Sequence, residues 1–344
     1  MASSSRRKAP SQPETRPESR PQYTNEQLQT YFSRIRLPQE YLESPVLSDP
    51  SLALGREHGL PLLCGLTRYH ACNVPFENIE LHYSEHKTIS LDMGHLYDRF
   101  ALDGPRYGRG GRCMENNGFF GTVLRSLGYD VRNCAARVSR MIHPDRQTRE
   151  KQGSTYGGWN HMLNLVRLDG QWHVVDVGMG AMGPNMPYPL EDGYETESIA
   201  PRKIRLQKRS IPEHVPTSDG DAQKLWCYDV CFQPDAEGGV RWTPAYCFTE
   251  TEYLPQDYEM MSWFTSTCPR SFFTQSVMCS KMLMDDAGEK LVGNITLFDD
   301  AVHKTIGGDR QLLQTCATDR ERIEALESIF HVRLTDAQRK AALE

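Results

Sequence analysis

Between positions 24 and 128, apolar residues recur at the three- and four-residue spacing of amphipathic helices. Thr24 and Gln27 form a capping-box pattern directly before the first such segment, and a second segment runs from 60 to 69. A third segment begins at Cys113 and ends at Gly128, since glycine commonly follows the last turn of a helix. The apolar positions of the first and third segments are Leu28, Tyr31, Phe32 and Ile35, and Phe120, Val123, Leu124 and Leu127. This part of the chain is therefore predicted to be a helical bundle.

After Gly128 the pattern changes to short runs rich in Val and Leu, separated by turn residues. The runs cover 129–138, 161–168, 171–177, 226–233 and 272–283, and they predict a mostly antiparallel sheet or small barrel. Near the end, Thr318 with Glu321 and Thr335 with Gln338 repeat the capping pattern, so the chain is predicted to close on helices. The predicted fold class is α+β, with a helical bundle at 24–128, a β-barrel at 129–250 and a last segment at 251–344.

The composition is that of an ordinary globular protein. The chain has 344 residues, with 39 basic and 45 acidic side chains and a net charge of -6. Nucleic-acid-binding surfaces usually carry a basic excess, so nucleic acid is not expected as a partner. Residues 1–23, rich in Ser, Arg and Pro, predict a disordered tail. No apolar run approaches the roughly 18 residues of a membrane span, and no secretory signal is recognised, so the expected location is the cytoplasm.

Ten cysteines lie far apart along the chain. Because no secretory signal is recognised, reduced thiols are expected rather than a disulfide framework. Cys227 and Cys231 have the spacing of half a zinc site, but no second pair accompanies them, so no metal site is predicted. All the cysteines except Cys113 are interpreted as small buried apolar residues.

Cys113 differs from the other cysteines because glycines at 108, 110 and 111 directly precede it and a helix begins there. Glycines allow a tight turn and a close approach of other backbone. The first turn of a helix presents unpaired N–H groups and the positive end of its dipole, which favour a thiolate over a thiol. Arg109 and Arg112 add positive charge nearby. Cys113 is therefore the candidate nucleophile.

A hairpin supplies the candidate base and the group that orients it. Asp169-Gly170 is a dipeptide favoured in two-residue hairpin turns, and it separates two strand-like runs. If Leu168 pairs with Gln171, then His161 and Asp176 lie one diagonal step apart on the same face. Diagonal neighbours are about 7–8 Å apart at the backbone, so an imidazole and a carboxylate can meet between them. With Cys113 these residues predict a Cys–His–Asp triad.

Four pieces of the chain carry a family resemblance: 74–78 (VPFEN), 109–113 (RGGRC), 158–162 (GWNHM) and 175–178 (VDVG). In this order and spacing the sequence resembles the arylamine N-acetyltransferase family from about residue 24 onward. The resemblance implies a helical bundle, a central antiparallel β-barrel and a C-terminal α/β lid, with 251–344 forming the interdomain segment and lid. It also implies a papain- or transglutaminase-like catalytic core and ping-pong transfer of an acyl group from acyl-coenzyme A (acyl-CoA) to an arylamine or hydrazine, as in xenobiotic detoxification.

Further roles follow from the resemblance alone. Acyl-CoA would be a co-substrate and no cofactor would be tightly bound; the protein would be a monomer or weak homodimer without a membrane partner. The coenzyme-binding residues would be Gly157, Gly158, Phe264, Arg270 and Ser271, and the residues lining the acceptor pocket would be Val138, Met179 and Phe76. Arg112 departs from the family pattern, which often has an aromatic residue there. The favoured interpretation is that Arg112 faces the coenzyme phosphates or solvent.

The donor and the reaction class have alternatives. Acetyl transfer is the first choice, and propionyl or malonyl transfer stays open, since Arg112 or Arg270 could meet a malonyl carboxylate. A transglutaminase-like cysteine hydrolase would use the same triad. A catalytically silent binding domain is the alternative from another class.

Overall fold

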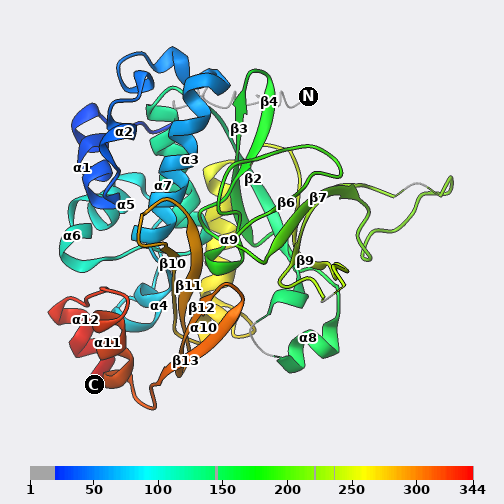
Figure 1. The fold of residues 1–344 in the computed structure, drawn as a ribbon. Coiled ribbons are helices and arrows are strands. Elements are labelled where there is room, and N and C mark those ends of the chain that lie inside the picture. Colours follow the sequence, from blue (N-terminus) through cyan, green and yellow to red (C-terminus); the bar gives the residue numbers. More distant parts are fainter. Residues whose placement is uncertain (1–19, 144–145, 221, 236, 344) are drawn as a thin grey trace, which may run out of the picture.

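A computed structural model describes residues 20–143, 146–220, 222–235 and 237–343. Most helices of the first third pack around one apolar cluster (Figure 1). Their bounds are α1 Asn25–Ile35, α2 Gln39–Leu42, α3 Arg56–Asn73, α4 Ile79–Tyr83, α5 Met93–Tyr97, α6 Gly104–Tyr107 and α7 Cys113–Ser126. The Thr24–Gln27 capping box is present, so the predicted start of the first helix is confirmed. The predicted start of the third helix at Cys113 is also confirmed.

Helix α7 is buried along most of its length. Phe119, Phe120, Val123 and Leu124 are 0% exposed and belong to the cluster that α1 and α3 share. Burial of each such side chain stabilises the fold by about 1.5–3 kcal/mol relative to exposure. The helix that begins with Cys113 is therefore fixed by the core of the bundle.

The larger sheet is antiparallel, has eight strands and curls around its own apolar cluster, in the order β5-β4-β3-β2-β9-β8-β7-β6. The strands are β2 Asp130–Val138, β3 His161–Leu168, β4 Gln171–Val175, β5 Tyr188–Pro189, β6 Glu195–Glu197, β7 Lys203–Arg209, β8 Leu225–Cys231 and β9 Thr243–Phe248. Helix α8, Arg146–Gln152, lies between β2 and β3 in the sequence. The predicted pairing of Leu168 with Gln171 is confirmed.

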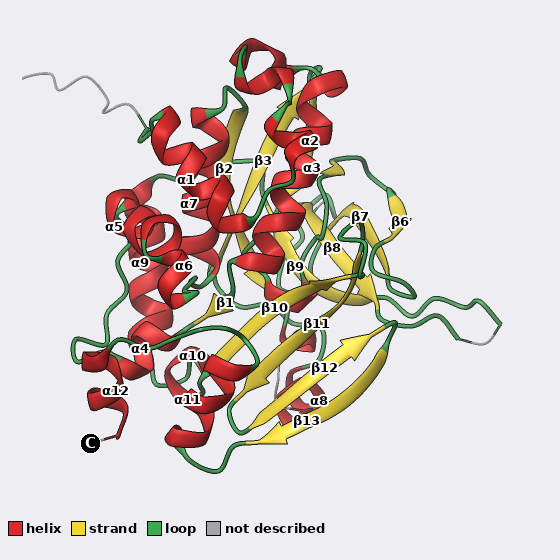
Figure 2. Cartoon of the chain, turned by 60° about the vertical axis from the view of Figure 1, so that its left-hand side comes forward, coloured by secondary structure: helices red, strands yellow, loops and turns green. Residues whose placement is uncertain are grey.

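A second antiparallel sheet has the order β1-β10-β11-β12-β13 (Figure 2). Its first strand, β1 Phe76–Glu77, comes from the helical part of the chain, and Phe76 pairs with Ser280. The others are β10 Met278–Met284, β11 Leu291–Phe298, β12 Ala301–Ile306 and β13 Asp309–Thr315. Helices α11 Asp319–Ser328 and α12 Asp336–Leu343 follow, and both predicted capping pairs are present.

Helix α9, Pro255–Thr267, appears in yellow near the middle of the molecule (Figure 1). It is followed by α10, Phe272–Gln275. The prediction of one strand over 272–283 is therefore wrong in its first half, because residues 272–275 form a helical turn after Ser271 and the strand begins at Met278.

The predicted disordered tail at 1–23 includes four residues that the structure describes, Arg20 to Tyr23. Residues 1–19 lie outside the described residues, but Arg20 forms an ion pair with Glu252 at 2.8 Å. The Tyr23 hydroxyl donates to the Met93 carbonyl at 2.9 Å, and its ring packs near Phe119. The packed chain therefore includes residues 20–23. None of the described helices is long and apolar enough to cross a bilayer.

Candidate active site

The turn before α7 packs against the extended segment that leads into β1. The Gly111 N–H donates to the Pro75 carbonyl at 3.2 Å. A Cβ at Gly110 would lie 2.0 Å from the same carbonyl oxygen, so only glycine fits there. Arg109 donates to Glu77 at 2.9 Å and fixes the other side of the turn. These contacts place Cys113 at the first residue of α7.

His161 and Asp176 meet as the hairpin register predicts. His161 begins β3 and Asp176 follows β4, and the His161 Nε2 to Asp176 Oδ2 distance is 2.7 Å. Both residues are buried, with 2% and 1% exposure. The other carboxylate oxygen, Oδ1, accepts from the Asn117 amide and the Gly178 N–H, each at 2.8 Å. Both carboxylate oxygens of Asp176 are therefore hydrogen-bonded.

The carboxylate changes the protonation of the imidazole. Burial alone would lower the pKa of His161, but the charge of Asp176 and its hydrogen bond raise that pKa to about 10. A hydrogen bond with the Cys113 side chain contributes in the same direction. His161 is consequently protonated at neutral pH, the state that stabilises a neighbouring thiolate.

The Cys113 side chain is 6% exposed and packs with Tyr258 and Met261 of α9. Its thiol also lies 3.8 Å from the Asn160 carbonyl, next to His161 in the chain. All ten cysteines are free. Burial raises the pKa of Cys134 to about 12 and that of Cys227 to about 11, which disfavours their thiolates. The arrangement at Cys113 can support nucleophilic attack on an acyl group.

Two residues near the candidate triad were missed by sequence reasoning. Asn117 donates to Asp176 and to the Met162 carbonyl at 2.6 Å, and it accepts from the Val177 N–H at 3.0 Å. Its position four residues after Cys113, on the same helix face, was an available signal. The Tyr246 ring of β9 lies beside His161, with ring centroids 5.4 Å apart. No local pattern indicates this contact, because β9 reaches His161 only through sheet pairing.

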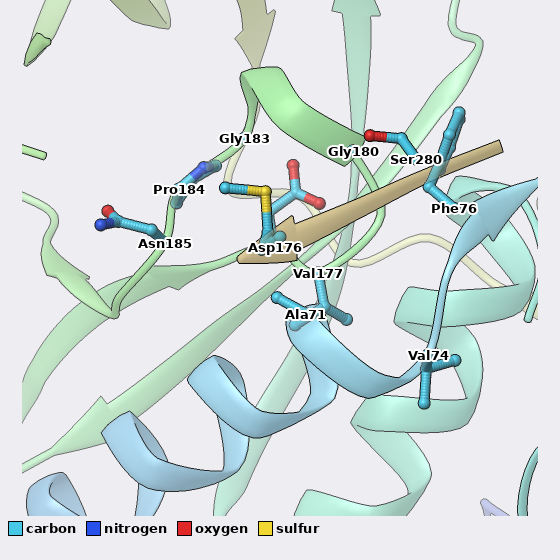
Figure 3. Close-up of a pocket in the computed structure, with 11 residues that line it drawn as sticks. Ala71, Val74, Phe76, Asp176, Val177, Gly180, Gly183, Pro184, Asn185 and Ser280 are labelled. Atoms are coloured by element: carbon cyan, nitrogen blue, oxygen red, sulfur yellow. The ribbon is translucent and has the colours of Figure 1, made fainter. Parts of the chain in front are cut away.

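A small cavity of about 20 Å³ lies beside Asp176 (Figure 3). Phe76, Gly180 and Ser280 are among its lining residues, so it lies between the segment after β4 and strand β10. This volume accommodates about one water molecule and no substrate. It lies next to the Asp176 end of the candidate triad.

Comparisons with known proteins identify the family of the chain. A family model described as N-acetyltransferase matches residues 59–339. The chain belongs to the arylamine N-acetyltransferase family.

Three similar proteins illustrate the range of the family. The N-malonyltransferase FDB2 of Fusarium pseudograminearum is 57% identical over 94% of this chain and 93% of its own length. The arylamine N-acetyltransferase of Mycobacterium tuberculosis is 30% identical over 83% and 87%, respectively. The structure of Mycobacterium marinum arylamine N-acetyltransferase in complex with CoA matches with a TM-score of 0.67 and 23% identity, covering 92% of this chain and 97% of that chain. The fold is thus the α+β arylamine N-acetyltransferase fold.

Within this fold the residues expected to line the acceptor pocket are spread out. Phe76 packs against the apolar cluster that contains Cys113. Met179 packs instead against the cluster of the eight-stranded sheet. Val138 ends β2, and its N–H donates to the Asn160 side chain at 3.0 Å. Only Phe76 is therefore in the cluster around the candidate nucleophile.

The residues expected to bind coenzyme lie on two segments. Gly157 and Gly158 precede β3, with Gly157 buried and Gly158 exposed. Phe264 on α9 is 50% exposed. In the loop after α9, Arg270 is exposed, and the Ser271 hydroxyl donates to the Thr265 carbonyl at 2.7 Å. These coenzyme roles remain predictions of the family resemblance.

The structure contradicts the interpretation that Arg112 faces solvent. Its side chain is 4% exposed, and its guanidinium donates to three hydroxyl groups of α9. The guanidinium also lies 5.1 Å from the centroid of the Phe273 ring. The physical reason is that α9 covers the start of α7 and offers hydroxyl acceptors there.

Gly178→Ala is expected to impair the site of this N-acetyltransferase fold. A Cβ at Gly178 would lie 2.4 Å from the Asn117 amide nitrogen and 2.7 Å from Cys113 Cα, so α7 or the segment after Asp176 must shift. Since a shift of about 1 Å in a reacting group can cost roughly 100-fold, acyl transfer should fall by about that factor. Single-turnover acylation of Cys113 measures it. Gly55→Ala is the matched control, because the nearest atom to its Cβ lies at 3.7 Å. Equal rates in both variants would contradict the described contact.

Proposed function

We propose that the protein is an N-malonyltransferase that transfers a malonyl group from malonyl-CoA, through a thioester on Cys113, to the nitrogen of an amine. The observation that carries this proposal is the 57% identity to N-malonyltransferase FDB2 over 94% of the chain. The similarity to an enzyme named for acetyl transfer is 30%. Members of this family use acyl-CoA as a co-substrate, and the expected reaction needs no tightly bound cofactor.

In the first half-reaction, the Cys113 thiolate attacks the carbonyl carbon of the acyl thioester. The tetrahedral intermediate collapses, the bond from carbon to the coenzyme sulfur breaks, and His161 donates its proton to that sulfur. Asp176, 2.7 Å from the imidazole, fixes the ring orientation and stabilises the protonated form before transfer. The acyl group is then bonded to Cys113.

In the second half-reaction, an amine nitrogen attacks the thioester carbonyl, and the neutral His161 accepts the proton that the nitrogen loses. The bond from carbon to the Cys113 sulfur breaks, which restores the thiolate paired with protonated His161. An aromatic amine fits this step because its nitrogen is uncharged and nucleophilic at neutral pH. The acceptor class and a role in detoxification belong to the proposal.

A panel of malonyl-, acetyl- and propionyl-CoA with one arylamine tests the donor. We expect malonyl transfer to exceed acetyl transfer by at least about tenfold, the difference that one charge-assisted contact produces. Release of free CoA and the mass of the amide product are the readouts.

The same panel separates the alternatives. Faster acetyl than malonyl transfer would make the protein an N-acetyltransferase. Release of CoA at the same rate without amine, yielding the free acid, would indicate a cysteine hydrolase that uses the same triad.

A further inference from the structure

The guanidinium of Arg112 lies in an unusual setting next to the nucleophile. Its Nη1 donates to the Thr265 hydroxyl at 3.2 Å. Its Nη2 donates to the hydroxyls of Ser262 at 3.2 Å and Ser266 at 2.7 Å. All three acceptors are neutral and lie on α9. The hydrogen bonds position the guanidinium but do not neutralise its charge.

Among the described ion pairs, Arg112 shares its one carboxylate with another arginine. Glu115, 1% exposed, lies 3.7 Å from the Arg112 Nε and also pairs with Arg99. One carboxylate therefore serves two guanidinium groups. Arg109, the other arginine of this turn, has its own partners in Glu77 and Glu80. Arg112 therefore has no carboxylate of its own among these pairs, and because burial of an incompletely compensated charge is costly, its surroundings favour an anionic ligand.

Arg112 directly precedes Cys113, and both residues lie next to α9. Cys113 belongs to the same buried apolar cluster as Tyr258 and Met261 of α9, and Arg112 donates to Ser262 and Thr265 of that helix, which follow Met261 directly and after one further turn. In a malonyl thioester on Cys113, the terminal carboxylate carbon is three bonds from sulfur, about 4 Å away. An acetyl group is too short to reach this region and carries no charge to place there.

One hydroxyl group near Arg112 is available as a hydrogen-bond donor. Thr265 and Ser266 donate to carbonyl groups of their own helix, at 3.0 Å and 2.6 Å. Among the described residues, the Ser262 hydroxyl accepts a hydrogen bond from Arg112 and donates none. The Ser262 hydroxyl can therefore donate to a carboxylate while it continues to accept from Arg112.

We infer that Arg112 and Ser262 form the subsite for the terminal carboxylate of a malonyl-type acyl group, which makes Arg112 the residue that selects the donor. The inference rests on the proposed function, since it concerns the acyl group carried by Cys113. Arg270, the other candidate, is exposed and interacts with the side chain of Cys268 on its own loop. Arg270 is therefore placed outside the proposed subsite.

The test compares acylation of Cys113 by malonyl-CoA and acetyl-CoA in single turnovers, followed by intact-protein mass. Arg112→Met should lower the malonyl rate about 10- to 100-fold more than the acetyl rate, because a charge-assisted contact is lost for one donor only. Ser262→Ala should lower the malonyl preference about tenfold. Arg270→Met is the matched control, and it should change both rates by the same factor.

Each outcome decides a different point. If the wild-type protein accepts acetyl but not malonyl groups, the proposed function fails and the subsite fails with it. A second outcome is that the wild type is malonylated, Arg112→Met lowers the acylation rates with malonyl-CoA and acetyl-CoA equally, and Ser262→Ala keeps the preference for malonyl-CoA. In that case the subsite is refuted and the proposed function stands. Circular dichroism shows whether Arg112→Met folds. If it does not fold, the donor preference is measured in Ser262→Ala and Arg112→Lys instead, and an unchanged preference in both variants overturns the inference.

Discussion

Replacing Cys113 with alanine should abolish acyl transfer, with a fall of at least about a thousandfold, while the protein keeps its fold. The reason is that the proposed intermediate is a thioester on this sulfur, and no other group can form it. The fold should survive because α7 is fixed by its buried apolar side chains and by the turn at Gly110, neither of which involves the sulfur. Intact-protein mass after incubation with malonyl-CoA should show no adduct.

Cys134→Ala is the matched control for this prediction. Cys134 is buried in strand β2, and its raised pKa of about 12 disfavours a nucleophilic thiolate. This variant should therefore retain transfer. Substantial activity in Cys113→Ala, or loss of activity in a folded Cys134→Ala, would show that the nucleophile has been assigned to the wrong residue.

Asp176→Asn should be nearly inactive, with a loss of about 10³- to 10⁴-fold, although the two side chains have almost the same shape. In the wild type the carboxylate raises the pKa of His161 to about 10. Without that charge, burial is the dominant influence and shifts the pKa below its usual value of 6.5. His161 then becomes neutral at neutral pH, and the thiolate loses its charged partner.

The pH dependence of alkylation tests the sign of this effect. In the wild type, iodoacetamide should react with Cys113 at mildly acidic pH, because His161 stays protonated up to about pH 10. In Asp176→Asn this reaction should slow. Both proteins should carry Cys268→Ala, since backbone hydrogen bonds from the Arg270 region lower the pKa of the accessible Cys268 thiol and would add a second reactive site. Identical pH profiles would argue against the charge pairing of His161 with Asp176.

The unfolding free energy should also depend on pH through the raised pKa of His161. The pKa of His161 is higher in the folded protein than in the unfolded chain, so its ion pair stabilises the fold fully below about pH 6.5 and this contribution is lost as the pH rises through about 10. The difference in unfolding free energy between wild type and Asp176→Asn should therefore shrink in alkaline buffer.

The hairpin could be predicted from sequence because its geometry is local. Asp169 and Gly170 both have positive φ, at 47° and 80°, as a two-residue turn between twisted strands requires. That turn fixes the strand register, and the register brings His161 and Asp176 together. The start of α7 could also be predicted from the sequence, because glycines followed by an amphipathic segment are a local pattern.

Contacts that depend on distant segments could not be predicted. Arg112 binds hydroxyls about 150 positions away, and nothing near it in the sequence indicates that α9 covers it. The helical turn at 272–275 has the same apolar character as the strand that follows. The Asn78 side chain, from the first third of the chain, donates to the carbonyls of Phe273 in this turn and of Ser276 directly after it. The roles of the coenzyme-binding residues stay predictions for the same reason.

The pairing of β1 with β10 has a consequence for synthesis on the ribosome. The segment from Pro75 to Glu77 shapes the turn before Cys113, but Phe76 and Glu77 complete their sheet only with Ser280 and Cys279. Those partners are translated long after the nucleophile, and domains assemble as their segments emerge. While residues 114–278 are being added, a nascent chain thus carries the Cys113 thiol without the strand pairing that completes the segment before it. We expect truncated chains that end before β10 to contain Cys113 but to be unable to form the acyl thioester on it.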